Sequence, residues 1–151
     1  MSKPGISLAT SLLLVVSGLT TWGQSLQDES IAELHIRANV PDQKNFDKFL
    51  KRDLERYFKD TKKKTVTVEY ELLRKGPTQS GIAYPKFYAW VTIRDEGTVD
   101  DEGAVRVAAV EKNRFDVTDF VSKADIERSP MTVDRIFPKA VADTIRERLV
   151  K

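Results

Sequence analysis

Hydrophobic and polar residues follow distinct periodic patterns along the chain, and each pattern predicts one element. Between residues 32 and 40 every second position is apolar. A period of two predicts a strand with one buried face. A helical interpretation through Ile31, Leu34 and Ala38 leaves Ile36 and Val40 unexplained, so we favour the strand.

A different period follows Pro41–Asp42. From Phe46 to Phe58 large apolar residues recur at helical spacing, with charged residues on the other positions. This pattern predicts an amphipathic helix of about four turns, capped by Asp42. The helix should end near Lys62–Lys64, where apolar residues stop.

Strand patterns then dominate the next part of the chain. Alternation or short apolar runs predict strands at 65–72, 86–93, 104–110 and 115–118, separated by a loop rich in Gly and Pro (75–85), an acidic loop (95–102) and a turn (111–114). Short connections favour an antiparallel meander.

The C-terminal part carries helix signals again. Ser122 and Asp125 have capping-box spacing, and Pro138 suits the start of a last helix. Phe137, Val141, Ile145 and Leu149 form a single stripe at four-residue spacing. We therefore expect short helices that dock through this stripe.

Together these elements predict an α+β fold: a long helix on a curled antiparallel sheet, in the order β-α-β-β-β-β, followed by short C-terminal helices. This element order, across about 32–118, resembles that of cystatin-like and NTF2-like folds. The resemblance implies a shape shared by protease inhibitors, ligand-binding cones and uncharacterised exported domains. Residues 77–83 lack the Gln-Val-Val-Ala-Gly run of the true inhibitors, so it implies shape and not function.

The first 25 residues differ from the rest. Lys3 precedes an uncharged apolar stretch from Ile6 to Leu19, and small and polar residues follow. This order predicts a secretory signal peptide at 1–25 and one domain at 26–151. We therefore expect a periplasmic or secreted protein. The alternative is an uncleaved anchor that holds the domain to the outside of a membrane.

Composition excludes several kinds of chemistry. The chain has no Cys, which excludes thiol catalysis and thiolate metal sites. Its 25 basic and 23 acidic residues nearly balance, whereas a nucleic-acid binder usually shows a basic excess. His35 is the one histidine; we interpret it as an exposed strand residue, and no nucleophile motif accompanies it. We predict no catalytic residue, metal or cofactor.

Two charged segments remain. The carboxylates of 95–102 could bind calcium, but their order does not match an EF-hand loop, and we favour a solvated hairpin loop. Lys and Arg predominate over acids at 42–64, as on an anion-binding helix or on the wet face of a docked one. A meander should bring the acidic loop back to Lys62–Lys64, so the two segments should meet.

The aromatic residues give the one candidate binding face. Tyr88 and Trp90 oppose Phe87, Ala89 and Val91 on the same strand, so both strand faces are apolar. We favour covering of the Trp90 face by the C-terminal helices. If it is instead an open pocket, its predicted lining is Tyr84, Tyr88, Trp90 and Arg106.

Three functions are compatible with these features. The first is a non-enzymatic exported domain that binds a protein or a small apolar ligand. The second is a hydrolase or isomerase that uses carboxylates in a cone-shaped cavity. The third is an envelope-associated structural protein, anchored by its N-terminus and using the basic helix. We expect the first, with membrane contact only if the N-terminal segment is retained.

Overall fold

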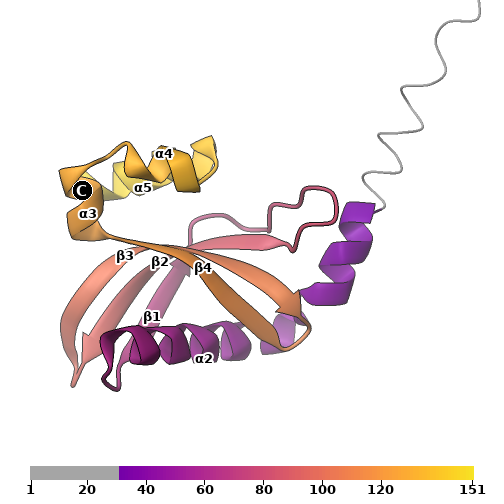
Figure 1. The fold of residues 1–151 in the computed structure, drawn as a ribbon, viewed down its shortest axis with the longest axis horizontal. Coiled ribbons are helices and arrows are strands. Elements are labelled where there is room, and N and C mark those ends of the chain that lie inside the picture. The colour runs from indigo at the N-terminus through magenta and orange to yellow at the C-terminus, as the bar shows by residue number, and fades with distance from the viewer. Residues whose placement is uncertain (1–30) are drawn as a thin grey trace, which may run out of the picture.

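The computed structural model describes residues 31–151, so the predicted signal peptide lies outside the described part. A helix over 31–39 leads into α2 (Gln43–Lys62), which is followed by an antiparallel meander in the order β1-β2-β3-β4 (Figure 1). The elements of the meander and the C-terminal helices are β1 (Thr67–Leu72), β2 (Lys86–Asp95), β3 (Thr98–Glu111), β4 (Arg114–Ser122), α3 (Lys123–Arg128), α4 (Thr132–Ile136) and α5 (Lys139–Leu149).

The sheet lies between two helical layers. In Figure 1, α2 covers one face, and the C-terminal helices lie on the other side. Each face has its own apolar cluster: one contains Leu54 and Val91, the other Trp90 and Ile145. Register shifts in the β2–β3 and β3–β4 pairs accompany the curl of the sheet. The α+β class and the long helix on an antiparallel sheet are therefore confirmed.

The predicted first strand at 32–40 is wrong, because this segment is helical. Its partly buried residues include Ala32, His35, Ile36 and Asn39, which is helical spacing. The helix ends where Val40 N–H donates to the Ile36 carbonyl and the Asn39 side chain donates to the His35 carbonyl. Alternation in a short segment rich in helix formers did not distinguish the two periods. The sheet consequently has four strands, not five.

The helix α2 is oriented by three consecutive residues. Leu54 is fully buried against the sheet, and each neighbour is rotated about 100° from it. Asp53, 2% exposed, accepts the Phe115 N–H of β4 at 2.8 Å. Glu55 accepts the Val68 N–H of β1 at 3.3 Å. One carboxylate thus reaches each edge strand of the sheet.

Asp53 is the one charged residue that is buried among residues 31–151. Besides Phe115 N–H, its carboxylate accepts Arg52 Nε at 2.9 Å and pairs with Arg56 at 2.8 Å. Arg52 also donates to the Asn113 carbonyl in the β3–β4 turn. Because the charge is buried with several donors, it ties the hairpin to α2.

The remaining fold predictions have clear outcomes. Ser122 Oγ accepts the Asp125 N–H and caps α3, as its spacing predicted. The stripe at 137–149 docks as predicted: Phe137, Val141 and Ile145 are buried against Tyr88 and Trp90. None of the helices between residues 31 and 151 combines the length and the apolar character needed to cross a membrane.

Candidate functional site

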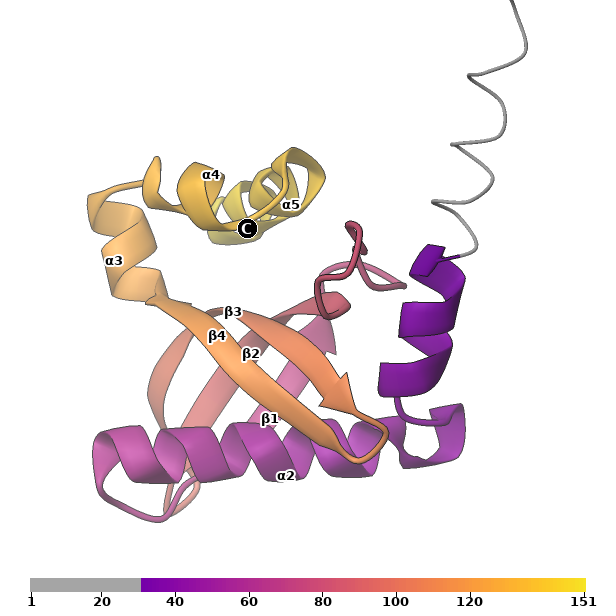
Figure 2. The same cartoon turned by 45° about the vertical axis from the view of Figure 1, so that its right-hand side comes forward.

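An apolar groove of about 420 Å³ opens where three segments meet. They are the link from the first helix into the first turns of α2, the end of β1, and the loop that leads into β2. In Figures 1 and 2 this loop lies beside the helix of residues 31–39. Apolar side chains form most of the lining, with three polar residues among them: Val40, Pro41, Phe46, Leu72, Pro77 and Phe87, with Gln43, Asp47 and Lys75.

The groove is held open by packing beneath it. Phe46 contacts the edges of Phe87 and Phe115, with ring centroids 4.9 and 5.2 Å apart. The loop is fixed where Thr78 bridges Lys86 and its hydroxyl hydrogen-bonds Tyr88. Since these contacts belong to the core and the sheet, the groove is formed without a ligand.

The rim of the groove has few polar groups. Asp47 accepts the Tyr70 hydroxyl at 2.7 Å; burial and this hydrogen bond raise the pKa of Tyr70 well above its ordinary value. Lys75 is exposed and forms no ion pair with a described residue. An apolar recess with few polar groups is the usual form of a ligand site.

The predicted binding face is covered. Tyr88 and Trp90 are each 4% exposed and pack with the C-terminal helices, which was the favoured alternative. Tyr84 is 49% exposed and outside this cluster. Arg106 bonds Asp119 at 2.7 Å and the Ile136 carbonyl at 3.0 Å. Of the four residues predicted to line a pocket, the structure brings only Tyr88 and Trp90 into one cluster. Ligand binding by these four residues stays a prediction.

The buried Trp90 ring contacts one partly exposed side chain, that of Arg148. The Arg148 guanidinium of α5 lies 5.3 Å from its ring centroid and pairs with Glu71 of β1 at 2.7 Å. These residues, with Glu69, Tyr70 and Thr92, line a second hollow of about 200 Å³. This hollow is polar, in contrast to the groove around Leu72.

The acidic segment 95–102 meets the basic end of α2, as the meander predicted. The predicted loop is shorter than expected, because only residues 96 and 97 form a turn and β3 begins at Thr98. Lys62 pairs with Asp100 at 2.9 Å and with Asp101 at 3.1 Å, and Lys64 pairs with Asp95 and Asp100. The hydrogen bonds from Lys64 and Lys62 hold the pKa of Asp100 below its ordinary value. These carboxylates therefore have lysine partners, and residues 31–151 contain no group of three or more side chains that could hold a metal ion.

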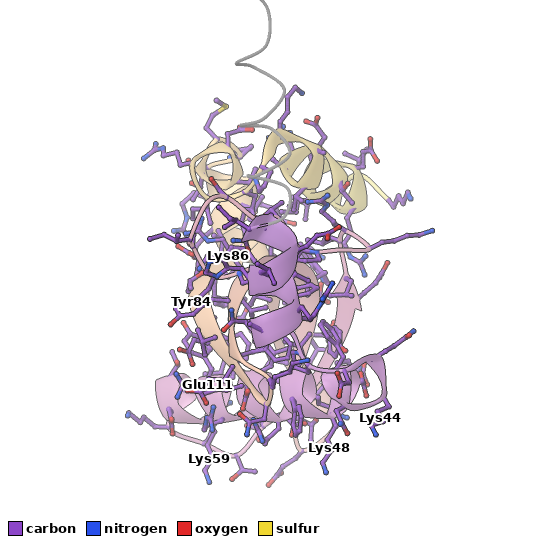
Figure 3. All side chains as sticks on the ribbon, turned by 90° about the vertical axis from the view of Figure 1, so that its right-hand side faces the viewer. Lys44, Lys48, Lys59, Tyr84, Lys86 and Glu111 are labelled. Atoms are coloured by element: carbon purple, nitrogen blue, oxygen red, sulfur yellow. The ribbon has the colours of Figure 1, made fainter. Side chains whose placement is uncertain are left out.

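The outer face of α2 remains basic. Figure 3 shows Lys44, Lys48 and Lys59 on the side of α2 remote from the C-terminal helices. The apolar face of the same helix is buried through Leu50, Leu54 and Phe58. His35, predicted to be exposed on a strand, is partly buried on the first helix.

No protein-family model matches the chain, and neither a curated protein nor a solved structure is significantly similar to it. The candidate function therefore depends on the geometry of the site. Sequence analysis missed both the groove and the role of Asp53. The sequence did indicate that Asp53 is buried. It stands three residues after Leu50 and four before Tyr57, so helical spacing places it within the apolar stripe of α2.

Proposed function

We propose that this chain is an exported, non-enzymatic binding domain that holds an apolar group of its ligand in the groove around Leu72. The observation that carries the proposal is a preformed recess of about 420 Å³ with a mainly apolar lining. Its volume is within the range of small-ligand sites.

The experiment that tests this proposal uses the neutral dye N-phenyl-1-naphthylamine, whose fluorescence rises in apolar sites. Leu72 is partly buried at the groove, so Leu72→Lys places a charge in the recess. We expect the dye to bind at least about fivefold more weakly to Leu72→Lys, about the cost of losing one methylene contact or more. Val99→Lys introduces the same charge at a strand residue that is 44% exposed and outside the groove, and this variant should bind the dye like the wild type.

Binding that is absent in the folded wild type, or equal in both variants, contradicts the proposal. If Leu72→Lys does not fold, amide chemical shifts of the wild-type chain give the same test. Dye addition should then shift the amides of Val40, Leu72 and Phe87, and shifts confined to other residues would contradict it.

A further inference from the structure

The outer edge of β1 runs past this groove, and the hydrogen-bond pattern shows which of its backbone groups face outward. Leu73 N–H donates to the Tyr88 carbonyl at 2.9 Å, in register with the pairs Glu71–Trp90 and Glu69–Thr92. In an antiparallel pair, successive residues alternate between bonding the partner and facing away. The N–H and C=O groups of Val68, Tyr70 and Leu72 therefore point away from β2.

One of these outward groups already has a partner. Val68 N–H donates to Glu55 of α2, which is consistent with the outward direction of the even-numbered residues. The backbone groups of Tyr70 and Leu72 make no such bond to any residue from 31 to 151. Two neighbouring outward residues offer the donors and acceptors that an added strand requires.

The side chains around this edge differ on the two faces of the sheet. On the α2 face, Leu72 lines the apolar groove. On the other face, Glu69 and Glu71 line the polar hollow with Arg148. Side chains of an extended peptide alternate between faces, so a strand added here would place every second side chain on the face of the sheet where the groove lies.

Charge then distinguishes between two possible occupants. A second copy of the chain, paired through β1, would bring Glu69 and Glu71 against the same residues of its partner, and like charges across a strand pair are destabilising. Both carboxylates are 65% exposed and bonded to one arginine each, Arg94 or Arg148. They can accept further donors, so they favour a basic strand.

We propose that an extended segment of a partner protein, with alternating apolar and basic residues, adds to β1 as a fifth strand. Its apolar residues enter the groove at Leu72, and its basic residues lie beside Glu69 and Glu71. This inference rests on the proposed function of the groove and names the partner of the same site.

The test uses a synthetic peptide of alternating Leu and Lys, and a control peptide of the same composition with the lysines grouped at one end. Isothermal titration with the full chain should show binding of the alternating peptide at least about tenfold tighter, because only this peptide can place leucines at the groove and lysines beside the glutamates together. Tenfold is about the worth of burying two methylene groups. Hydrogen exchange should show fast amides at Tyr70 and Leu72 in the free chain, and protected amides in the complex.

A matched pair of variants separates the contribution of the Leu72 backbone N–H to peptide binding from that of its side chain. Leu72→Pro removes an outward N–H, which an edge strand tolerates, whereas Leu72→Ala keeps it. We expect Leu72→Pro to weaken peptide binding about tenfold more than Leu72→Ala does. Equal binding by the two variants, or by the two peptides, overturns the inference. If the dye still binds in that case, the groove function survives; if neither dye nor peptide binds, the proposed function has failed as well.

Discussion

The two edges of the sheet are secured by the same helix in different ways. At β4, the buried Asp53 carboxylate accepts a backbone N–H and two arginines. At β1, the partly exposed Glu55 makes one longer hydrogen bond to Val68. Breaking the hydrogen bonds of a buried charge costs more than breaking those of a solvated one. We infer that β4 is the structural edge and that β1 is the edge left for recognition.

The sharpest test of this comparison replaces each carboxylate. Asp53→Ala leaves the Phe115 N–H buried without an acceptor, so it should lower the free energy of unfolding by about 3 kcal/mol. Glu55→Ala removes one longer hydrogen bond, made by a carboxylate that is itself partly exposed, and should lower the free energy of unfolding by less, about 1 kcal/mol. Chemical denaturation followed by circular dichroism measures both. Equal losses would show that the two edges are secured alike.

The packing of β4 against β3 gives a second test. A Cβ at Gly103 would lie 2.3 Å from the Val121 carbonyl oxygen and 2.9 Å from Ser122 Cα, whereas one at Gly76 would meet nothing within 4 Å. Gly103→Ala should therefore lower the free energy of unfolding by about 2 to 3 kcal/mol. Gly76→Ala, near the β1 side, is the control and should change it little. Thermal unfolding of both variants shows whether β4 packs too closely on β3 at position 103 to leave room for a side chain.

A smaller effect is expected where α5 supports β1. Arg148→Ala removes both the contact with the Trp90 ring and the ion pair with Glu71. We expect a loss of about 1 kcal/mol and a changed Trp90 emission. Arg148→Lys keeps the positive charge but not the planar group over the Trp90 ring, so it should be less destabilising than Arg148→Ala but still less stable than the wild type. An unchanged spectrum in Arg148→Ala would contradict this contact.

The smallest effect concerns Asp100, near the start of β3. The Asp100 pKa is lowered from its ordinary value of 3.8 by Lys64 and Lys62. Its stabilising contribution is thus complete above about pH 4 and is lost as the pH falls through the lowered pKa. Asp100→Asn should therefore be less stable than the wild type at neutral pH, and the gap should close in acid. Unfolding midpoints measured from pH 6 down to about pH 2 give the comparison; a gap that does not vary with pH would contradict it.

Sequence patterns located most elements but not the features that distinguish the two edges. The apolar stripe of α2 and the alternation at 65–72 were strong because burial imposes them directly. The strand prediction for 32–40 was wrong because the alternating Ala, Leu and Ile residues of this segment also produce an apolar face on a helix. The outward direction of Tyr70 and Leu72 depends on pairing phase with β2, and the groove depends on where Pro77 and Val40 converge. Neither leaves a periodic trace in the sequence.

The position of Leu54 between Asp53 and Glu55 has a consequence for specificity. The apolar surface of α2 is formed by the buried Leu50, Leu54 and Phe58 and by the partly buried Phe46, Phe49 and Tyr57. A rotation of α2 about its axis would move Asp53 away from the Phe115 N–H and Glu55 away from the Val68 N–H, and both backbone donors would lose their acceptors. These two hydrogen bonds, to opposite edges of the sheet, therefore favour one angular setting of α2.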